Sequence, residues 1–354
     1  TGATVLQDNV AIDTSSSNGT ITFSSTIDGG NNLDLASGSG AVSIGGTIGG
    51  TNALATLDIN NSSGAGAITL NDIGDTNTQG VTGTSNIGNN TTTTLTLAGT
   101  TYKTDAVTYT TKAGENIDLT GGSDTTFTTT NDDINFGTGT VEMANGSNLI
   151  VDTGTGGGAI NLTPGVMGTS SENITLTAGT GTVAIGATGT GTEIADVSIT
   201  TSGNTTFSGD FTGGSLTNNG PAIVSENMNL STTGNIDFGS TLDSLNGNQT
   251  ITFVTAADIT ITGEVGGSNP FSTFTITNAN NFTYSGGGSI SGFSSGKFSR
   301  TGGFAIFNPG PSIDNINTIE KTKDKEIAFF DAPVFKLIKS LVTPTVTDLI
   351  REKA

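Results

Sequence analysis

Short triplets in which two apolar residues flank a polar one recur along most of the chain. Examples are Ile68/Leu70 around Thr69 and Ile117/Leu119 around Asp118. This alternation places both apolar side chains on one face of a short strand and the middle side chain on the other face. No helical periodicity precedes about residue 310, so the pattern predicts an all-β protein over this length.

Every second triplet recurs after 23 or 24 residues, as from 33 to 57, from 174 to 197 and from 259 to 282. Three-residue strands cannot form stable isolated hairpins, so each coil must gain hydrogen bonds and apolar contacts from the coils above and below it. Segments rich in Gly and Asn, such as 28–32 and 154–158, can form the tight corners. The spacing predicts a parallel β-helix, or β-solenoid, of about 13 coils over residues 1–300, with residues 72–90 as a protruding loop. Tandem immunoglobulin-like sandwiches would need longer strands and a longer period.

The composition of the sequence changes near Pro270, where Phe becomes frequent. Ten of the 17 Phe residues lie at or beyond Phe271, and we expect bulky rings such as Phe293, Phe298, Phe304 and Phe307 to cover the open end of the solenoid. Residues 301–325 then form a closure and connector. Residues 326–354 form an amphipathic helical tail, which Asp331 can cap and Thr343-Pro344 can divide.

Composition excludes most familiar catalytic chemistry. The chain of 354 residues has 53 Gly but no Cys and no His, so disulfides, thiolate or imidazole metal sites and His-dependent catalytic triads are absent. Residues 1–296 carry 24 acidic residues and only Lys103 and Lys112, whereas residues 297–354 carry nine basic and seven acidic residues. The acidic body would repel nucleic acid and anionic membranes, and no apolar run is long enough to span a bilayer.

Carboxylates are the remaining candidates for chemistry. Clustered Asp residues serve β-helix enzymes that act on polysaccharides, and calcium prefers oxygen ligands. The candidates are the pair Asp132-Asp133 and four strand-centre residues that stacking could align on one face: Asp34, Asp58, Asp118 and Asp237. Solvated positions on the coil surface explain them more simply. Segments 154–159 and 292–297 resemble nucleotide-binding loops, but both lack the required following elements and are interpreted as turns.

Coils such as the segment 172–183, with Ile174-Thr175-Leu176 and Gly179-Thr180-Gly181, resemble the β-strand repeats of filamentous-haemagglutinin-like adhesins and of large autotransporter passengers. The resemblance covers residues 1 to about 300 and rests on pattern and composition. It implies a bacterial, exported, surface-displayed fibre built as a parallel β-helix without enzymatic activity. No N-terminal secretion domain of the haemagglutinin type is recognisable, and the tail has no counterpart in that family.

Three interpretations of the tail follow from its apolar stripe and its lysines. It packs on its own solenoid, rests on a membrane, or docks on a second copy, since a basic appendage complements an acidic body and head-to-tail contacts generate filaments. For self-association we expect an apolar set in the tail: Phe329, Phe330, Val334, Leu337, Ile338, Leu341, Val346, Leu349 and Ile350.

The sequence therefore predicts a non-enzymatic structural protein of the bacterial cell surface, either an extracellular fibre subunit or an adhesin segment. Its expected partners are other copies of itself, or cell-surface glycans and proteins; nucleic acid is not expected. It needs no cofactor, although calcium remains an option. The alternatives are an S-layer-like calcium-dependent lattice protein and a polysaccharide-acting β-helix enzyme.

Overall fold

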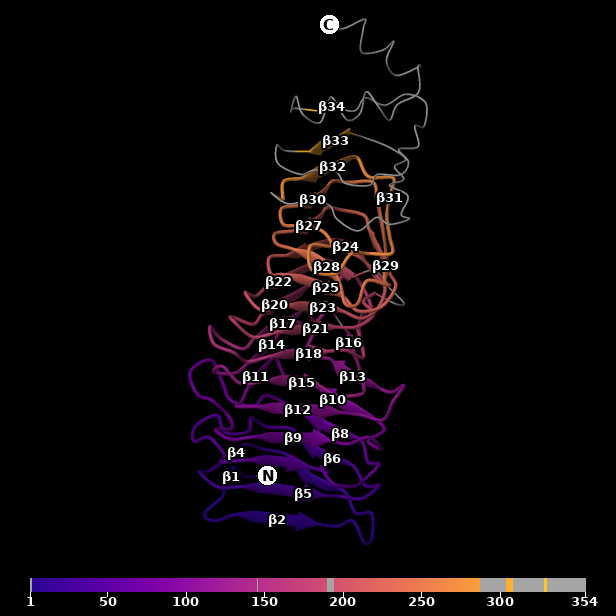
Figure 1. Cartoon of the computed structure of the whole chain (residues 1–354). Coiled ribbons are helices and arrows are strands. Elements are labelled where there is room, and N and C mark those ends of the chain that lie inside the picture. Colours follow the sequence, from indigo (N-terminus) through magenta and orange to yellow (C-terminus); the bar gives the residue numbers. More distant parts are fainter. Residues whose placement is uncertain (1, 145, 190–193, 287–303, 308–327, 330–354) are drawn as a thin grey trace, which may run out of the picture.

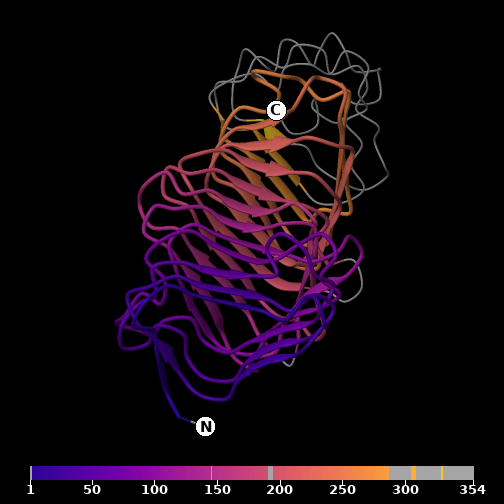
Figure 2. The ribbon, with the colours of Figure 1, turned by 90° about the horizontal axis from the view of Figure 1, so that it is seen from below.

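The computed structural model describes residues 2–144, 146–189, 194–286, 304–307 and 328–329, and over them the chain winds into a parallel β-solenoid of about 12 turns. The strands stack in sequence order along the axis (Figure 1), and the view along the rod shows the coils following one another around a common interior (Figure 2). The all-β parallel fold expected from the triplets is thereby confirmed, and the described residues contain no helix.

Each coil crosses three faces. The first face is an 11-stranded sheet, composed in order of β2 (Val10–Asp13), β5 (Leu33–Ala36), β7 (Leu57–Ile59), β9 (Ser85–Gly88), β12 (Val107–Thr110), β15 (Ile134–Phe136), β18 (Ile160–Leu162), β21 (Val183–Ile185), β23 (Thr205–Phe207), β25 (Ala222–Val224) and β28 (Leu242–Ser244).

The second face begins as a 7-stranded sheet of β3 (Ile21–Phe23), β6 (Val42–Ile44), β8 (Ile68–Leu70), β10 (Leu95–Leu97), β13 (Asn116–Leu119), β16 (Thr140–Met143) and β19 (Val166–Gly168). Isolated parallel bridges from Val166 to Thr188 and from Thr188 to Phe211 extend this face beyond β19. It then continues through β24 (Phe211–Asn218), β26 (Met228–Thr232), β29 (Thr250–Thr255) and β31 (Thr273–Thr277).

The third face starts with β1 (Thr4–Val5) and β4 (Ile27–Asp28) and passes through bridges at Ile48 and Ile73. Its later strands are β11 (Thr101–Lys103), β14 (Thr125–Thr128), β17 (Leu149–Asp152), β20 (Ile174–Thr177), β22 (Ile194–Thr200), β24, β27 (Ile236–Phe238), β30 (Ile259–Ile261), β32 (Asn281–Tyr284), β33 (Phe304–Phe307) and β34 (Ala328–Phe329). Strand β24 turns a corner, because Phe211 pairs with β26 on the second face and Leu216 pairs with β27 on the third.

The core is one column of inward-facing side chains. In β8, Ile68 and Leu70 are fully buried while Thr69 between them faces outward, and this alternation repeats in most strands. Aromatic rings stack within the interior: Tyr102 stacks on Phe127 with centroids 4.9 Å apart, and Tyr109 stacks on Phe136 at 5.5 Å. Because every coil shares its buried area with its neighbours, the three-residue strands are stable only as a stack.

Buried hydroxyl groups close many corners. The Ser37 Oγ donates to the carbonyl of Gly40 at 2.6 Å, and the Thr153 Oγ1 donates to the carbonyl of Gly158 at 2.7 Å. Each hydroxyl satisfies a carbonyl that the turn removes from the ladder. The Thr and Ser residues that follow strands are thus part of the interior as well as of the surface.

Three expectations need correction. Residues 72–90 are not one protruding loop, because Ile73 and Val81 form ladder bridges and Ser85–Gly88 is a strand. The number of residues per coil is not a uniform 23 or 24. On the first face it reaches 28 between the paired residues Leu57 and Ser85 and falls to 17 between Thr205 and Ala222. Corner loops of different length cause this spread, and the rod has about 12 turns instead of 13.

Toward the C-terminal end, Phe271, Phe274 and Phe282 are buried in the core. Phe304 and Phe307 belong to β33, which continues the ladder from β32. Phe293 and Phe298 lie outside the described residues.

Candidate functional site

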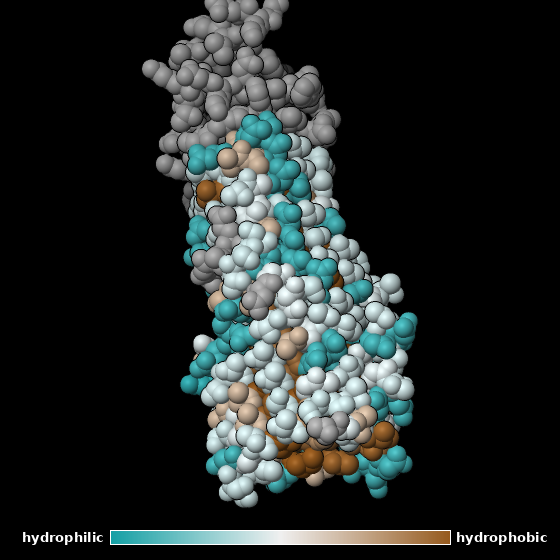
Figure 3. Space-filling model, turned by 180° about the vertical axis from the view of Figure 1, so that it is seen from behind, coloured by the Kyte–Doolittle hydropathy of each residue, from teal (hydrophilic) through white to brown (hydrophobic). Residues whose placement is uncertain are grey.

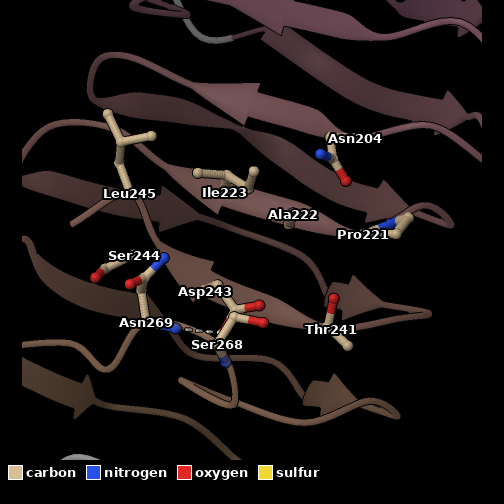
Figure 4. A pocket seen from close by; sticks show the side chains of 10 residues that line it. All are labelled: Asn204, Pro221, Ala222, Ile223, Thr241, Asp243, Ser244, Leu245, Ser268 and Asn269. Atoms are coloured by element: carbon tan, nitrogen blue, oxygen red, sulfur yellow. Dashed lines mark hydrogen bonds between the residues drawn. The ribbon is translucent and has the colours of Figure 1, made fainter. Parts of the chain in front are cut away.

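A shallow pocket opens on the outer surface of the first face, where that face ends (Figure 4). In β25 the apolar pair Ala222 and Val224 points inward, so Ile223 faces outward. The register places Ile223 directly beside Asp243, which is the outward residue of β28. An aliphatic side chain and a carboxylate are therefore neighbours on the surface.

The wall of the pocket is the next coil. Strand β28 is the last of the 11-stranded sheet, and the coil that follows adds only the bridge from Leu242 to Val265 before it leaves the face. The loop that results is fixed by Ser244, whose Oγ donates to the carbonyl of Pro270 at 2.7 Å, and by Asp243, whose Oδ1 accepts from the amide of Ser268 at 3.0 Å. The hydrogen bond from the Ser268 amide thus fixes the Asp243 carboxylate and also attaches the loop to β28.

The pocket has a volume of about 290 Å³ and an apolar and a polar flank. Ile223 and Leu245 lie on one flank, and Leu245 is one of only two large apolar side chains that stand exposed among the described residues, at 51%. The polar flank consists of Asp243, Ser268 and Asn269, with Asn204 and Thr241 at the margin (Figure 4). The arrangement can hold a group that has both an apolar and a polar or cationic part.

A second feature is a pair of carboxyl groups at a corner of the rod. Val107 pairs with Ile134, so Asp105 and Asp132, each two residues earlier, occupy equivalent positions on successive coils. Contact with the Asp132 carboxyl, together with partial burial, raises the pKa of Asp105 to about 6. Asp133 faces a different partner, because its Oδ1 accepts from the amide of Ala159 at 2.7 Å. The predicted pair Asp132-Asp133 is therefore split, and Asp105 takes the place of Asp133.

The four strand-centre aspartates do not share one face, contrary to expectation. Asp34 and Asp58 are direct neighbours on β5 and β7, and partial burial, Asp58 and Asp13 raise the pKa of Asp34. Asp118 lies on the second face beside Glu142, where burial and that neighbour raise its pKa, and Asp237 lies on the third face beside Thr217 and Thr260. The alternation predicted the outward direction of each carboxylate but not which of the three faces it occupies.

Sequence reasoning missed Ile223, Asp243 and Leu245. The signal was present, because Ile223 is an apolar residue at the outward position of its triplet, where Thr, Asn or Asp usually stands. The predicted turn at 154–158 is confirmed as the connection between β17 and β18.

Only Phe329 of the nine predicted tail residues is described, and its backbone lies in β34 paired with β33. The expected helix over Val334, Leu337, Ile338 and Leu341, and the positions Phe330, Val346, Leu349 and Ile350, lie outside the described residues. The segment 292–297 lies outside them as well.

Within the described part of the chain, no three or more Asp and Glu residues gather closely enough to hold a metal ion. None of the same residues forms a helix of the length and apolarity that crossing a membrane requires. Figure 3 shows a surface of mainly neutral and polar residues, with apolar atoms gathered at the end that holds the first coils.

The fold and the outward polar ladders define a β-solenoid repeat protein. No family model, curated protein or solved structure matches the chain.

Proposed function

We propose that this chain is a structural, non-enzymatic protein of the bacterial cell surface, a subunit of an extracellular fibre or a segment of an adhesin. The observation that carries the proposal is the single core cluster of buried side chains, which extends from Leu6 to Tyr284 beneath parallel ladders. About 12 turns at the ~4.8 Å spacing of neighbouring strands make a rod about 58 Å long. Such a rod spans a distance and presents repeated polar faces along it.

The charge of the rod supports display in an aqueous exterior. Residues 1–296 hold 24 acidic residues against two lysines, a balance that disfavours nucleic acid and anionic membranes as partners. The partners that fit are other copies of the chain, or glycans and proteins of a cell surface. Self-association through the tail would use the apolar positions from Phe329 to Ile350.

A calcium-dependent surface lattice is the second candidate, and one observation favours it. Asp34 and Asp58 stand side by side on adjacent strands, and two neighbouring carboxylates are a common part of a calcium site. A lattice of this kind would disperse when calcium is chelated, whereas a fibre built on apolar and basic contacts would not.

The surface location is tested by antibody labelling of intact cells of the source organism. The proposal predicts labelling without permeabilisation, while an antibody against a cytoplasmic protein labels only permeabilised cells. Labelling of this chain only after permeabilisation would contradict the proposal.

The tail is tested with the purified full chain. Leu337→Asp combined with Leu341→Asp should abolish self-association in sedimentation velocity, because each change places a charge on the apolar stripe. Thr318→Asp, outside the predicted helices, is the control and should leave self-association intact. Equal self-association of all three proteins would exclude the tail as the contact.

A further inference from the structure

We infer that the pocket between Ile223 and Asp243 receives a lysine or arginine side chain from the C-terminal residues of a second copy of this chain. The inference rests on the proposed self-association and names the receiving site. It therefore specifies one contact of the assembly.

The geometry suits a long basic side chain. Such a side chain has an apolar stem and a charged head, and Ile223 and Leu245 offer the stem an aliphatic flank (Figure 4). The Asp243 carboxylate lies on the opposite flank, fixed through Oδ1 to the amide of Ser268. Among the residues that the structure describes, no hydrogen bond is made to Oδ2, which leaves one carboxylate oxygen for an incoming donor.

The charge distribution selects a cation. The two lysines of residues 1–296 are engaged elsewhere: the Lys112 Nζ lies 4.0 Å from Glu115, and the Lys103 Nζ donates to the carbonyl of Thr76 at 3.5 Å. Asp243 thus lies in the field of an acidic rod and in a concave site, where a cation gains more than a neutral group does. The other nine basic residues of the chain all lie within residues 297–354.

The topology favours a second copy over the same copy. The pocket opens on the first face, whereas the last described strands, β32, β33 and β34, lie on the third face. Four of the nine basic residues, Lys336, Lys339, Arg351 and Lys353, follow Phe329, and from the third face they would have to pass around a side of the rod to reach the pocket of their own copy. A neighbouring rod that lies alongside can present its C-terminal residues to the pocket directly, and the two copies would then overlap in a stagger.

The test is sedimentation velocity of the full chain over a range of concentrations, at low and at high salt. Asp243→Asn should weaken self-association about five-fold, because it removes the charge while the amide oxygen can still accept from Ser268. Leu245→Ser should weaken it as well, since Leu245 is exposed and its loss leaves the core intact. Asp237→Asn is the matched control, an outward aspartate at a strand centre of the third face with only Thr217 and Thr260 beside it in the ladder, and should have no effect. Added salt should weaken the wild-type association.

Each outcome is informative. Association of the Asp243→Asn and Leu245→Ser variants equal to that of the wild type would overturn this assignment while leaving self-association standing. A wild-type chain that stays monomeric at every concentration would overturn both proposals. Far-UV circular dichroism and thermal unfolding of each variant distinguish loss of contact from loss of fold.

Discussion

Asp105 and Asp132 occupy equivalent positions on successive coils, and their carboxyl groups meet at one corner of the rod. Two carboxylates in contact repel each other when both are ionised, so the contact favours a state in which one is protonated. The pKa of Asp105 is accordingly raised to about 6 from an ordinary value of 3.8.

The sign of the resulting pH dependence follows from this shift. The folded state binds the proton more tightly than the unfolded chain, so the stabilisation is complete below about pH 4 and is lost as the pH rises through about 6. Asp105→Asn should remove this dependence and raise the melting temperature at pH 7 by about 1–2 °C, a modest effect because the site is partly exposed. Thermal unfolding of both proteins between pH 4 and pH 8 checks it, with Asp124→Asn as the control. A wild-type melting profile that Asp105→Asn leaves unchanged would show that the two carboxyl groups do not interact.

The sequence predicted the strands that contain Val107 and Ile134, but not the contact between Asp105 and Asp132 that precede them. Alternation around Val107 and Ile134 fixes which side chains face inward, because burial of one strand face permits a single register. It does not fix the length of each corner loop, and those lengths decide which outward residues become neighbours. For the same reason the sequence did not show that, of the four strand-centre aspartates, only Asp34 and Asp58 are neighbours, while Asp118 and Asp237 lie on other faces.

Glu172 is a buried carboxylate held by its own turn. Its Oε2 accepts from the amides of Thr169 at 2.9 Å and Ser170 at 2.8 Å, and its Oε1 accepts from both of their hydroxyl groups. Burial acts to raise the pKa, but these hydrogen bonds outweigh it and the pKa of Glu172 is lowered. The stabilisation is therefore present above the ordinary value of 4.5 and is lost as the pH falls below it.

Glu172→Gln should destabilise the protein by about 1–3 kcal/mol at neutral pH, because the amide group of Gln faces donors that need an acceptor. Glu115→Gln is the control, since the Glu115 side chain is 42% exposed and its ion pair with Lys112 is long at 4.0 Å. Chemical denaturation at pH 7 measures both variants. Equal stability of the two would mean that the turn does not depend on a charged acceptor.

Tyr109 and Tyr102 provide a matched pair in the aromatic core. The hydroxyl group of Tyr109 is buried and has no hydrogen-bond partner among the described residues, whereas that of Tyr102 accepts from the amide of Gly99 at 3.0 Å. Tyr109→Phe should leave stability unchanged or raise it by about 1 kcal/mol, and Tyr102→Phe should lower it by about 1 kcal/mol. Denaturant unfolding of the two variants checks the order. A loss of stability in Tyr109→Phe would indicate a bound water that pairs with the hydroxyl.

Gly49 shows how closely the coils approach. It has a positive φ of 66°, and an added Cβ would overlap the carbonyl of Gly80 on the next coil. Gly49→Ala should therefore destabilise the rod by about 1–3 kcal/mol. Gly30→Ala, where a Cβ would meet nothing, is the control. Thermal unfolding of the two variants measures the difference. Identical melting temperatures would mean that the coils at Gly49 and Gly80 have room for a Cβ atom.

Electron microscopy of the purified full chain at neutral pH, with and without a calcium chelator, tests the central claim that this rod is a self-associating structural subunit. The account predicts filaments built from rods whose coil stack is about 58 Å long, unchanged by the chelator. Single separate particles under both conditions would contradict it.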